Sequence, residues 1–105
     1  MSKKQIMLAC AAGMSTSLLV TKMEKAADNR GLEADIFALP LTEAEDYALS
    51  HPVDVVLLGP QVAYQLSAFQ ESLAEKDIPV AVVPMVDYGM MNGDKVIALA
   101  ESLMK

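Results

Sequence analysis

The chain has 105 residues, of which 53% are hydrophobic, and this length and composition favour one globular domain over residues 1–105. Its formal net charge of −6 argues against a nucleic-acid-binding protein, because such proteins present basic surfaces. A single cysteine excludes an internal disulfide, and a single histidine makes a His-based or Cys/His metal site unexpected. We therefore expect no metal and no other cofactor.

The amino-terminal segment indicates a cytoplasmic protein. Lys3 and Lys4 are not followed by an apolar stretch long enough for a secretory signal. No window approaches the roughly 20 apolar residues of a membrane span. The lone cysteine suits a reducing compartment. No long apolar strip is left over once the expected elements are assigned, so we expect a monomer.

The first three elements are expected to be a strand, a helix and a second strand. Gln5 to Ala9 is a continuous apolar run, typical of a strand covered on both faces. A helix is expected from Ser15 to Arg30, with Gly31 placed to stop it. Its apolar residues recur at helical spacing: Leu18, Leu19, Met23, Ala26 and Ala27. Alternating residues from Glu33 to Leu39 predict the second strand, which Pro40 ends.

A short helix, a strand and a longer helix are expected next. Thr42-Glu43-Ala44-Glu45 has the form of a capping box and predicts a helix through about Leu49. Val53 to Leu58 is rich in valine and apolar apart from Asp54, which is the clearest strand pattern in the chain. Gly59-Pro60 then turns the chain into a helix expected from Gln61 to Glu75.

The last expected elements are a strand from Ile78 to Val83, a loop, and a helix from Asp94 to Met104. Strands and helices thus alternate, which predicts an α/β fold with a four-stranded parallel sheet and helices on both faces, a flavodoxin-like three-layer sandwich. Ligands of such sheets bind beyond the carboxyl ends of the strands. The segments expected at that edge are residues 10–17, 59–61 and 84–92.

Cys10 stands where the first strand ends and the first helix is about to begin. A helix amino terminus has unpaired N–H groups and a partial positive charge, so it favours a thiolate over a thiol. Small residues after the cysteine let several N–H groups converge on an anion such as phosphate, and three hydroxyls add donors or cap the first turn. The expected phosphate-binding residues are Ala11, Ala12, Gly13, Met14, Ser15, Thr16 and Ser17. The segment predicts a nucleophilic cysteine that forms a phosphocysteine.

The missing arginine separates this segment from that of a hydrolase. Low-molecular-weight cysteine phosphatases use a Cys-x5-Arg loop, but here the sixth residue after Cys10 is Thr16 and the loop holds no arginine. Losing one oxyanion donor costs a hydrolase about 2.7–4 kcal/mol of barrier, so this loop is better suited to passing a phosphoryl group on.

Two alternatives stay open at this point. A phosphatase or an arsenate-reductase-like enzyme is one, because Asp87-Tyr88 lies where a leaving-group acid would stand, although such reductases usually carry further cysteines. A regulatory module that binds an anion without covalent chemistry is the other.

Two motifs resemble one protein family. Cys10 to Leu19, CAAGMSTSLL, resembles the active-site loop of the IIB components of the bacterial sugar phosphotransferase system, lactose/cellobiose (chitobiose) family. Val55 to Gln61, VVLLGPQ, together with Ala63 and Tyr64, resembles that family's second signature. The similarity covers essentially the whole chain, including its length and its order of strands and helices.

The resemblance implies a phosphoryl relay. In that family a cytoplasmic IIA protein donates from a phosphohistidine to the IIB cysteine, and IIB then phosphorylates a sugar that the membrane IIC component imports. Cys10 matches the phosphorylated position, and Ala11 to Ser17 match the phosphate loop. The implied sugar is a disaccharide such as cellobiose, chitobiose or lactose, or another β-glucoside. This chain does not encode which one, since IIC makes most of the sugar contacts.

Partner contacts around Cys10 are expected to be mainly apolar, because an acidic surface disfavours docking by charge onto another acidic protein. Met14 and Tyr88 are expected at the rim of this contact, and Gln61 and Asp87 are further candidates for the rim or the pocket. Each also has a purely structural interpretation, Gln61 as the start of a helix and Asp87-Tyr88 as an ordinary surface loop.

Met90 and Met91 fall in the same expected loop as Asp87. Flexible methionine side chains in loops are suited to adaptable docking surfaces, although most methionines only fill gaps in a core. We therefore treat these two, with Met14, as candidates for an apolar docking surface.

Overall fold

The computed structural model describes residues 3–11 and 14–104, with the side chains of residues 14–16 excepted. Within these residues, parallel strands form one sheet in the order β2-β1-β3-β4. The strands are β1 (Lys4–Cys10), β2 (Ala34–Pro40), β3 (Val55–Leu58) and β4 (Val80–Val82). This architecture confirms the predicted α/β fold with a parallel sheet.

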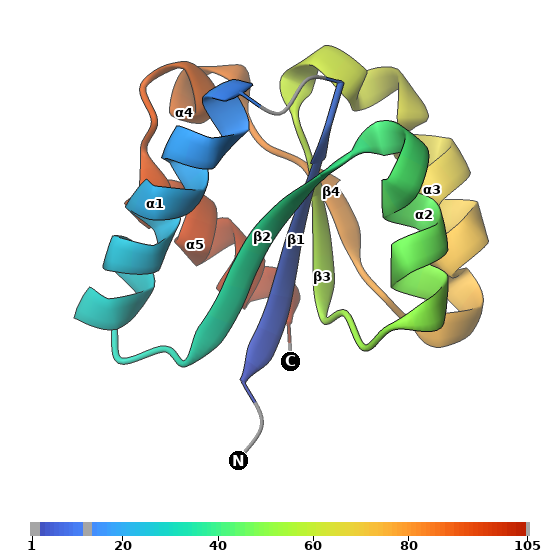
Figure 1. The fold of residues 1–105 in the computed structure, drawn as a ribbon, viewed down its shortest axis with the longest axis horizontal. Helices are drawn as coiled ribbons and strands as arrows, with labels where there is room; N and C mark the ends of the chain where they lie inside the picture. Colours follow the sequence, from blue (N-terminus) through green and yellow to red (C-terminus); the bar gives the residue numbers. More distant parts are fainter. Residues whose placement is uncertain (1–2, 12–13, 105) are drawn as a thin grey trace.

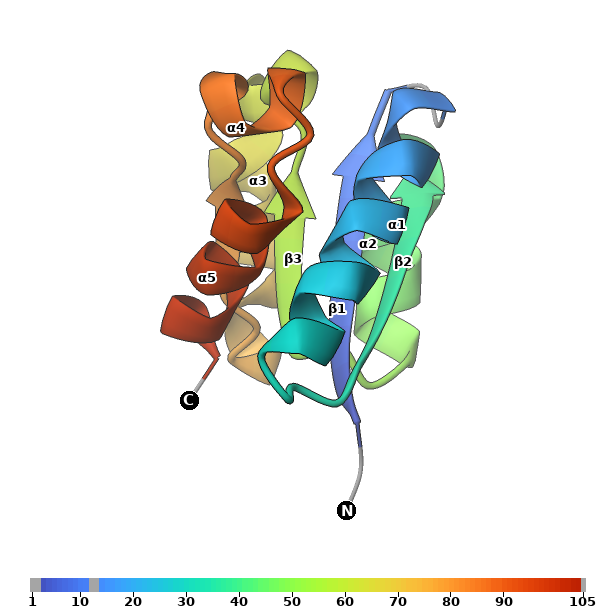
Figure 2. The same cartoon turned by 90° about the vertical axis from the view of Figure 1, so that its left-hand side faces the viewer.

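Helices connect the strands and cover both faces of the sheet (Figure 1). The α-helices are α1 (Met14–Asn29), α2 (Leu41–Ser50), α3 (Leu66–Leu73), α4 (Met85–Gly89) and α5 (Gly93–Leu103), and the 3-10 helices are η1 (Pro60–Gln65) and η2 (Ala74–Lys76). Figure 2 shows α1 and α5 in front of the sheet, with α2 and α3 behind it. No helix in the described part of the chain has the length and apolarity needed to cross a bilayer.

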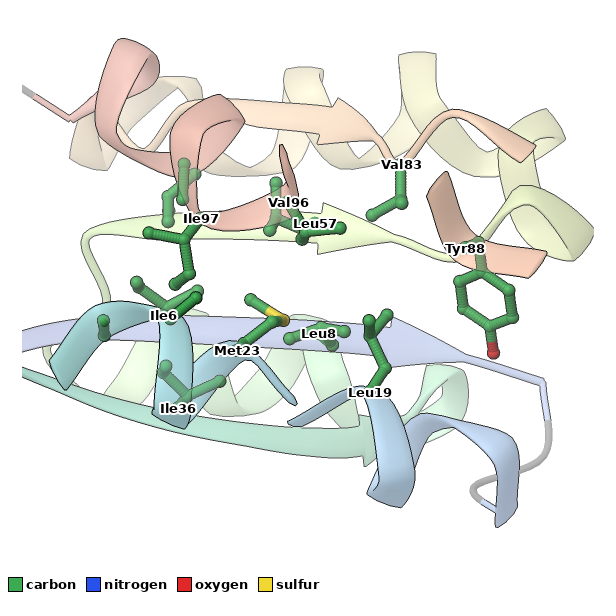
Figure 3. Packing of buried hydrophobic residues seen from close by; sticks show 14 residues of the cluster. Ile6, Leu8, Leu19, Met23, Ile36, Leu57, Val83, Tyr88, Val96 and Ile97 are labelled. Carbon is green, nitrogen blue, oxygen red and sulfur yellow. The ribbon is translucent and has the colours of Figure 1, made fainter. Parts of the chain in front are cut away.

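The core consists of two apolar clusters, one on each face of the sheet. The α1/α5 cluster holds Ile6 and Leu8 of β1, and the α2/α3 cluster holds Met7 and Ala9. Alternate side chains of β1 therefore point into opposite layers, which explains why its sequence is apolar without interruption from Ile6 to Cys10. Burying one such large side chain contributes about 1.5–3 kcal/mol. Figure 3 shows the α1/α5 cluster.

The carboxyl ends of the strands meet at one edge of the sheet, at the top of Figure 1. The chain continues from β1 towards α1, from β2 into α2, from β3 into η1 and from β4 into α4. The described residues of the three segments predicted to meet at this edge therefore do so.

Helix α2 differs from its prediction at its start. It begins at Leu41 after Pro40, which forms no side-chain capping hydrogen bond, so Thr42 lies inside the helix and the capping-box prediction is wrong. Pro40 is still paired with Cys10 as the last residue of β2, and this strand carries the chain directly into the helix.

The segments after β3 and β4 also differ from their predictions. The single helix expected from Gln61 to Glu75 is three segments, η1, α3 and η2. The backbone departs from α-helical dihedral angles at Val62 (φ −117°, ψ 26°), at Gln65 (φ −89°, ψ 0°) and at Leu73 (φ −99°, ψ 2°). The loop expected over 84–92 contains α4, a helix too short to show an apolar period in the sequence. The expected strands 53–58 and 78–83 shorten to β3 and β4.

The contact between α1 and α5 depends on a residue without a side chain. A Cβ atom added to Gly93, the first residue of α5, would lie 2.5 Å from the carbonyl carbon and oxygen of Lys22 in α1. Backbone atoms cannot move aside as a flexible side chain does. Nearby, Arg30 donates hydrogen bonds to Glu101 (2.9 Å) and Asp94 (3.1 Å) of α5, and the bond to Glu101 raises the pKa of Arg30.

Gly93→Ala is therefore expected to lower the free energy of unfolding by about 1–3 kcal/mol, because the helices must separate to admit the methyl group. Gly89→Ala is the matched control, since a Cβ there meets nothing within 4 Å. Urea unfolding followed by circular dichroism measures both. Equal stability of the two variants would contradict the close helix contact.

Candidate active site

Cys10 is the last residue of β1 and lies at the carboxyl edge of the sheet. Its strand is paired on both sides: Cys10 stands opposite Pro40 of β2, and Ala9 stands opposite Leu58 of β3. The N–H of Gly59 extends the second pairing by donating a hydrogen bond of 2.9 Å to the carbonyl of Ala9. The position of Cys10 is thus fixed by the central strand of the fold.

The side chain of Cys10 is buried, with 2% of its surface exposed. Cys10 therefore counts among the buried residues of the core, next to Ala9 and at the carboxyl edge of the sheet. Ala11, the next residue, is exposed.

Gly59 brings the second family-like motif against the cysteine. A Cβ atom on Gly59 would lie 3.5 Å from Cβ of Cys10 and 2.9 Å from Oε1 of Gln61. The side chains of Cys10 and Gln61 thus approach the same small space, which exists because residue 59 lacks a side chain. Gln61 was predicted as a rim residue, and its side chain is exposed above this space.

The predicted phosphate loop is only partly described. Ala12 and Gly13 lie outside the described residues, as do the side chains of Met14, Ser15 and Thr16, although the backbone of these three forms the first turn of α1. The loop's predicted role as an anion cradle therefore stays a prediction.

Ser17 has an exposed side chain, and its carbonyl accepts a hydrogen bond of 3.2 Å from Oγ1 of Thr21. The amino terminus of α1 lies at the same edge of the sheet as Cys10 (Figure 1). This placement is the one that the predicted role of the loop requires.

The other rim candidates are divided between surface and core. Asp87 of α4 is partly exposed, whereas Tyr88 is 7% exposed and lies at the same end of the α1/α5 cluster as Leu19 and Val83 (Figure 3). Tyr88 is thus a core residue, contrary to its expected place at the rim. Helix α4 accounts for the difference, since its coil turns Tyr88 inwards and leaves its other apolar residues outside.

The methionines after α4 are divided in the same way. Met90 is exposed, as expected of a docking residue. Met91 has a left-handed backbone (φ 54°), is half-buried and packs against the α1/α5 cluster. Its role in docking stays a prediction.

Exposed apolar side chains gather on the segments around Cys10. We call this set the apolar rim, and its members are Leu18 of α1, Tyr64 of η1, Met85 and Val86 of α4, and Met90. Of these five, only Met90 was predicted as a docking residue. Leu18 was expected among the apolar positions of the first helix, Tyr64 as part of the second motif, and Met85 and Val86 in the loop 84–92. Such a concentration of exposed apolar side chains is typical of a protein-binding surface.

The described residues contain no group of three His, Cys, Asp or Glu side chains arranged to hold a metal ion. One groove lies at the opposite edge of the sheet from Cys10, lined by Lys4, Asp54, Asp77, Pro79, Leu103 and Met104. A second lies between α2 and η1–α3. The arrangement at Cys10 offers a thiol and a neighbouring helix amino terminus, a combination suited to covalent transfer of an anionic group.

Comparison with known proteins agrees with this chemistry. Residues 5–99 match the family described as "PTS system, Lactose/Cellobiose specific IIB subunit". The chain is 49% identical, over 107 residues and 99% of both chains, to the "PTS system cellobiose-specific EIIB component" of Lactococcus lactis subsp. lactis (strain IL1403). It is equally identical, with the same coverage, to the "PTS system galactose-specific EIIB component" of Lactococcus lactis subsp. cremoris (strain MG1363).

A solved structure agrees as well. The cellobiose-specific phosphotransferase IIB component from Borrelia burgdorferi superimposes with a TM-score of 0.77 at 38% identity, covering 98% of this chain and 93% of that one. A match over residues 5–99, together with relatives of this identity and coverage, leaves one assignment. The chain belongs to the lactose/cellobiose-specific IIB subunits of the phosphotransferase system (PTS), which are phosphotransferases that pass a phosphoryl group to sugar.

Proposed function

We propose that Cys10 is the phosphoryl carrier of this IIB subunit. It receives the group from a phosphohistidine of a IIA protein and passes it to a sugar held by the membrane IIC component. One observation carries the proposal: the only thiol of the chain stands at the carboxyl end of β1, directly before the amino-terminal end of α1. Family membership supplies the reaction class, and this placement supplies the nucleophile.

The transfer has two displacements at phosphorus. The Cys10 thiolate attacks the phosphorus of the phosphohistidine, an S–P bond forms, and the P–N bond breaks with its electron pair returning to the imidazole. A sugar hydroxyl then attacks the phosphorus of phosphocysteine, the S–P bond breaks, and the thiolate is regenerated as the hydroxyl loses its proton. Positioning and fixed N–H donors supply most of the acceleration in such transfers. Residues 11–17 are proposed to provide these donors.

Gly59 is proposed to keep room for the phosphoryl group. The space that a Cβ would fill lies between Oε1 of Gln61 and Cβ of Cys10. A phosphoryl group on the sulfur needs room beside the cysteine, and any side chain at position 59 reduces it. Because Cys10 is 2% exposed, its neighbours at this edge must also separate when the donor arrives.

The proposed substrate is a β-linked disaccharide or related β-glucoside. Relatives at the same 49% identity are named for cellobiose and for galactose, which supports the view that the IIC component sets the sugar. The proposed place of action is the cytoplasm, at the inner face of the membrane during transfer to IIC.

The apolar rim is proposed as the docking surface for the phosphohistidine donor. Its five exposed side chains come from α1, η1 and α4, the segments that border the edge on which Cys10 lies. Apolar contact suits a chain whose net charge is −6, because charge offers it no attraction to another acidic protein.

Cys10→Ser is expected to abolish labelling by a phosphorylated IIA donor, because a serine hydroxyl is a far weaker nucleophile than a thiolate at neutral pH. The fold should persist, since serine has the same number of side-chain atoms as cysteine and its oxygen is smaller than sulfur, and urea unfolding checks this. Radiolabelled phosphate on the chain is the measurement. Persistent labelling of the serine variant would refute the assignment of Cys10.

Gly59→Ala is expected to slow phosphoryl acceptance about 10- to 100-fold, the order of effect that follows from a small misplacement of reacting groups. Its cost in stability should stay below about 1 kcal/mol, because the nearest obstacle is the exposed, flexible end of Gln61. Gly89→Ala serves again as the control with no expected effect. An unchanged single-turnover rate in Gly59→Ala would contradict the proposed role of this space.

Met90→Gln is expected to raise the KM for the phospho-donor about threefold to tenfold without a change in stability, because it removes an exposed apolar contact from the rim. Leu49→Gln is the matched control: Leu49 is also exposed but lies near the other end of α2. Initial rates of labelling against donor concentration give both values. The same KM for the two variants would argue against the rim as the docking surface.

A further inference from the structure

Charge is distributed unevenly over the two layers of helices. No lysine or arginine occurs between Arg30 and Lys76, the stretch that includes α2, η1 and α3. Acidic residues in these three helices are Glu43, Glu45, Asp46 and Glu71. In the opposite layer, acidic and basic residues are balanced. Its basic residues are Lys22, Lys25, Arg30 and Lys95, and its acidic residues are Glu24, Asp28, Asp94 and Glu101. The α2/α3 face is therefore the acidic face of the molecule.

A groove of about 270 Å³ runs along this face between α2 and η1–α3. It is lined by Leu41, Thr42, Glu45, Asp46, Gln65 and Phe69. Phe69 is buried and Leu41 packs against the same α2/α3 cluster, so these two form an apolar floor. Glu45, which is half-buried, and the exposed Asp46 place carboxylates beside that floor.

The carboxylates of Glu45 and Asp46 make no hydrogen bond or ion pair with the rest of the described chain. Lys76 does not reach them, because its Nζ donates to the carbonyls of Ala48 and Leu49, each at 3.1 Å, at the other end of α2. A partly buried carboxylate without a partner gains from a cation that arrives with its own donors.

We infer, on the basis of the proposed function, that this groove docks a lysine- or arginine-bearing cytoplasmic segment of the membrane IIC component. The aliphatic stem of such a side chain would cover Phe69 and Leu41 while its charged end reaches Glu45 and Asp46. Cytoplasmic loops of membrane proteins carry an excess of lysine and arginine, so a IIC component offers this chemistry. The anionic lipid surface does not, because it repels an acidic face.

The groove is continuous with the edge that carries Cys10. Helix α2 begins directly after Pro40, the residue paired with Cys10, and η1 begins directly after Gly59 (Figure 1). A segment of IIC bound between these two helices would therefore lie beside the edge from which the phosphoryl group leaves. The apolar rim, on α1, η1 and α4, offers the donor a different set of residues.

The test compares two double variants with the same change in net charge. Glu45→Gln/Asp46→Asn removes both carboxylates from the groove, and Glu24→Gln/Asp28→Asn removes two exposed ones from α1 on the opposite layer. Each chain is phosphorylated by the IIA donor and then titrated into inverted membrane vesicles that contain the IIC component, with sugar phosphate as the product measured.

The groove variant should show a KM for the phosphorylated chain raised about 3- to 10-fold, an unchanged kcat at saturation, and a difference that shrinks as salt rises. Its labelling by the IIA donor should equal that of the wild type, and the α1 variant should match the wild type in both steps. An unchanged KM in the groove variant, or an equal rise in the α1 variant, would overturn the inference. A loss of donor labelling in the groove variant would also overturn it, because the groove would then serve the donor. Failure of the proposed function is a separate result, since it appears as labelling of Cys10→Ser.

Discussion

The pairing of β1 with both of its neighbours is the constraint on which the site depends. Strand β1 is an inner strand, held in register by β2 and β3. The position of its last residue, Cys10, at the carboxyl edge of the sheet is therefore fixed by strand pairing. The same register places Gly59 beside the cysteine, through its hydrogen bond to Ala9. Neither position depends on the loops themselves. The sheet thus sets the geometry, and the loops supply the chemistry.

The two apolar clusters separate the core from the partner-binding surfaces at the carboxyl edge of the sheet. Each cluster is completed by helices that start or end at this edge, so the core ends where the site begins. Helix α4 contributes both to the core and to the apolar rim. Tyr88 packs in the α1/α5 cluster, while Met85 and Val86 are exposed. The charge asymmetry adds a third feature: an acidic face on α2 and α3 beside an apolar rim on the other segments. A carrier that meets two partners in turn gains from surfaces of different chemistry, because each attracts its own partner.

Much of the fold was predictable from the sequence, because β1 and α1 show their structural periods plainly. The expected helix 15–30 differs from α1 by one residue at each end, and Gly31 ends it with a left-handed backbone (φ 71°). The all-parallel sheet followed from the alternation of elements, and the family followed from two short motifs.

Features that depend on tertiary contacts were not predictable in the same way. The break at Val62, the five-residue α4 and the burial of Tyr88 give no periodic pattern in the sequence. The capping-box pattern was misleading because the N-cap of α2 is Pro40, two residues before Thr42. The approach of Gln61 to Cys10 requires the register of two strands that lie far apart in the chain.

The central claim is that a single sulfur atom carries the phosphoryl group. Peptide mass mapping of the wild-type chain after incubation with phosphorylated IIA tests this most directly, because it locates the added group on a residue. The account predicts a gain of one phosphoryl group on the peptide that contains Cys10, and its removal by thiophilic reagents. A phosphoryl group on His51 or on a serine, with Cys10 unmodified, would contradict it.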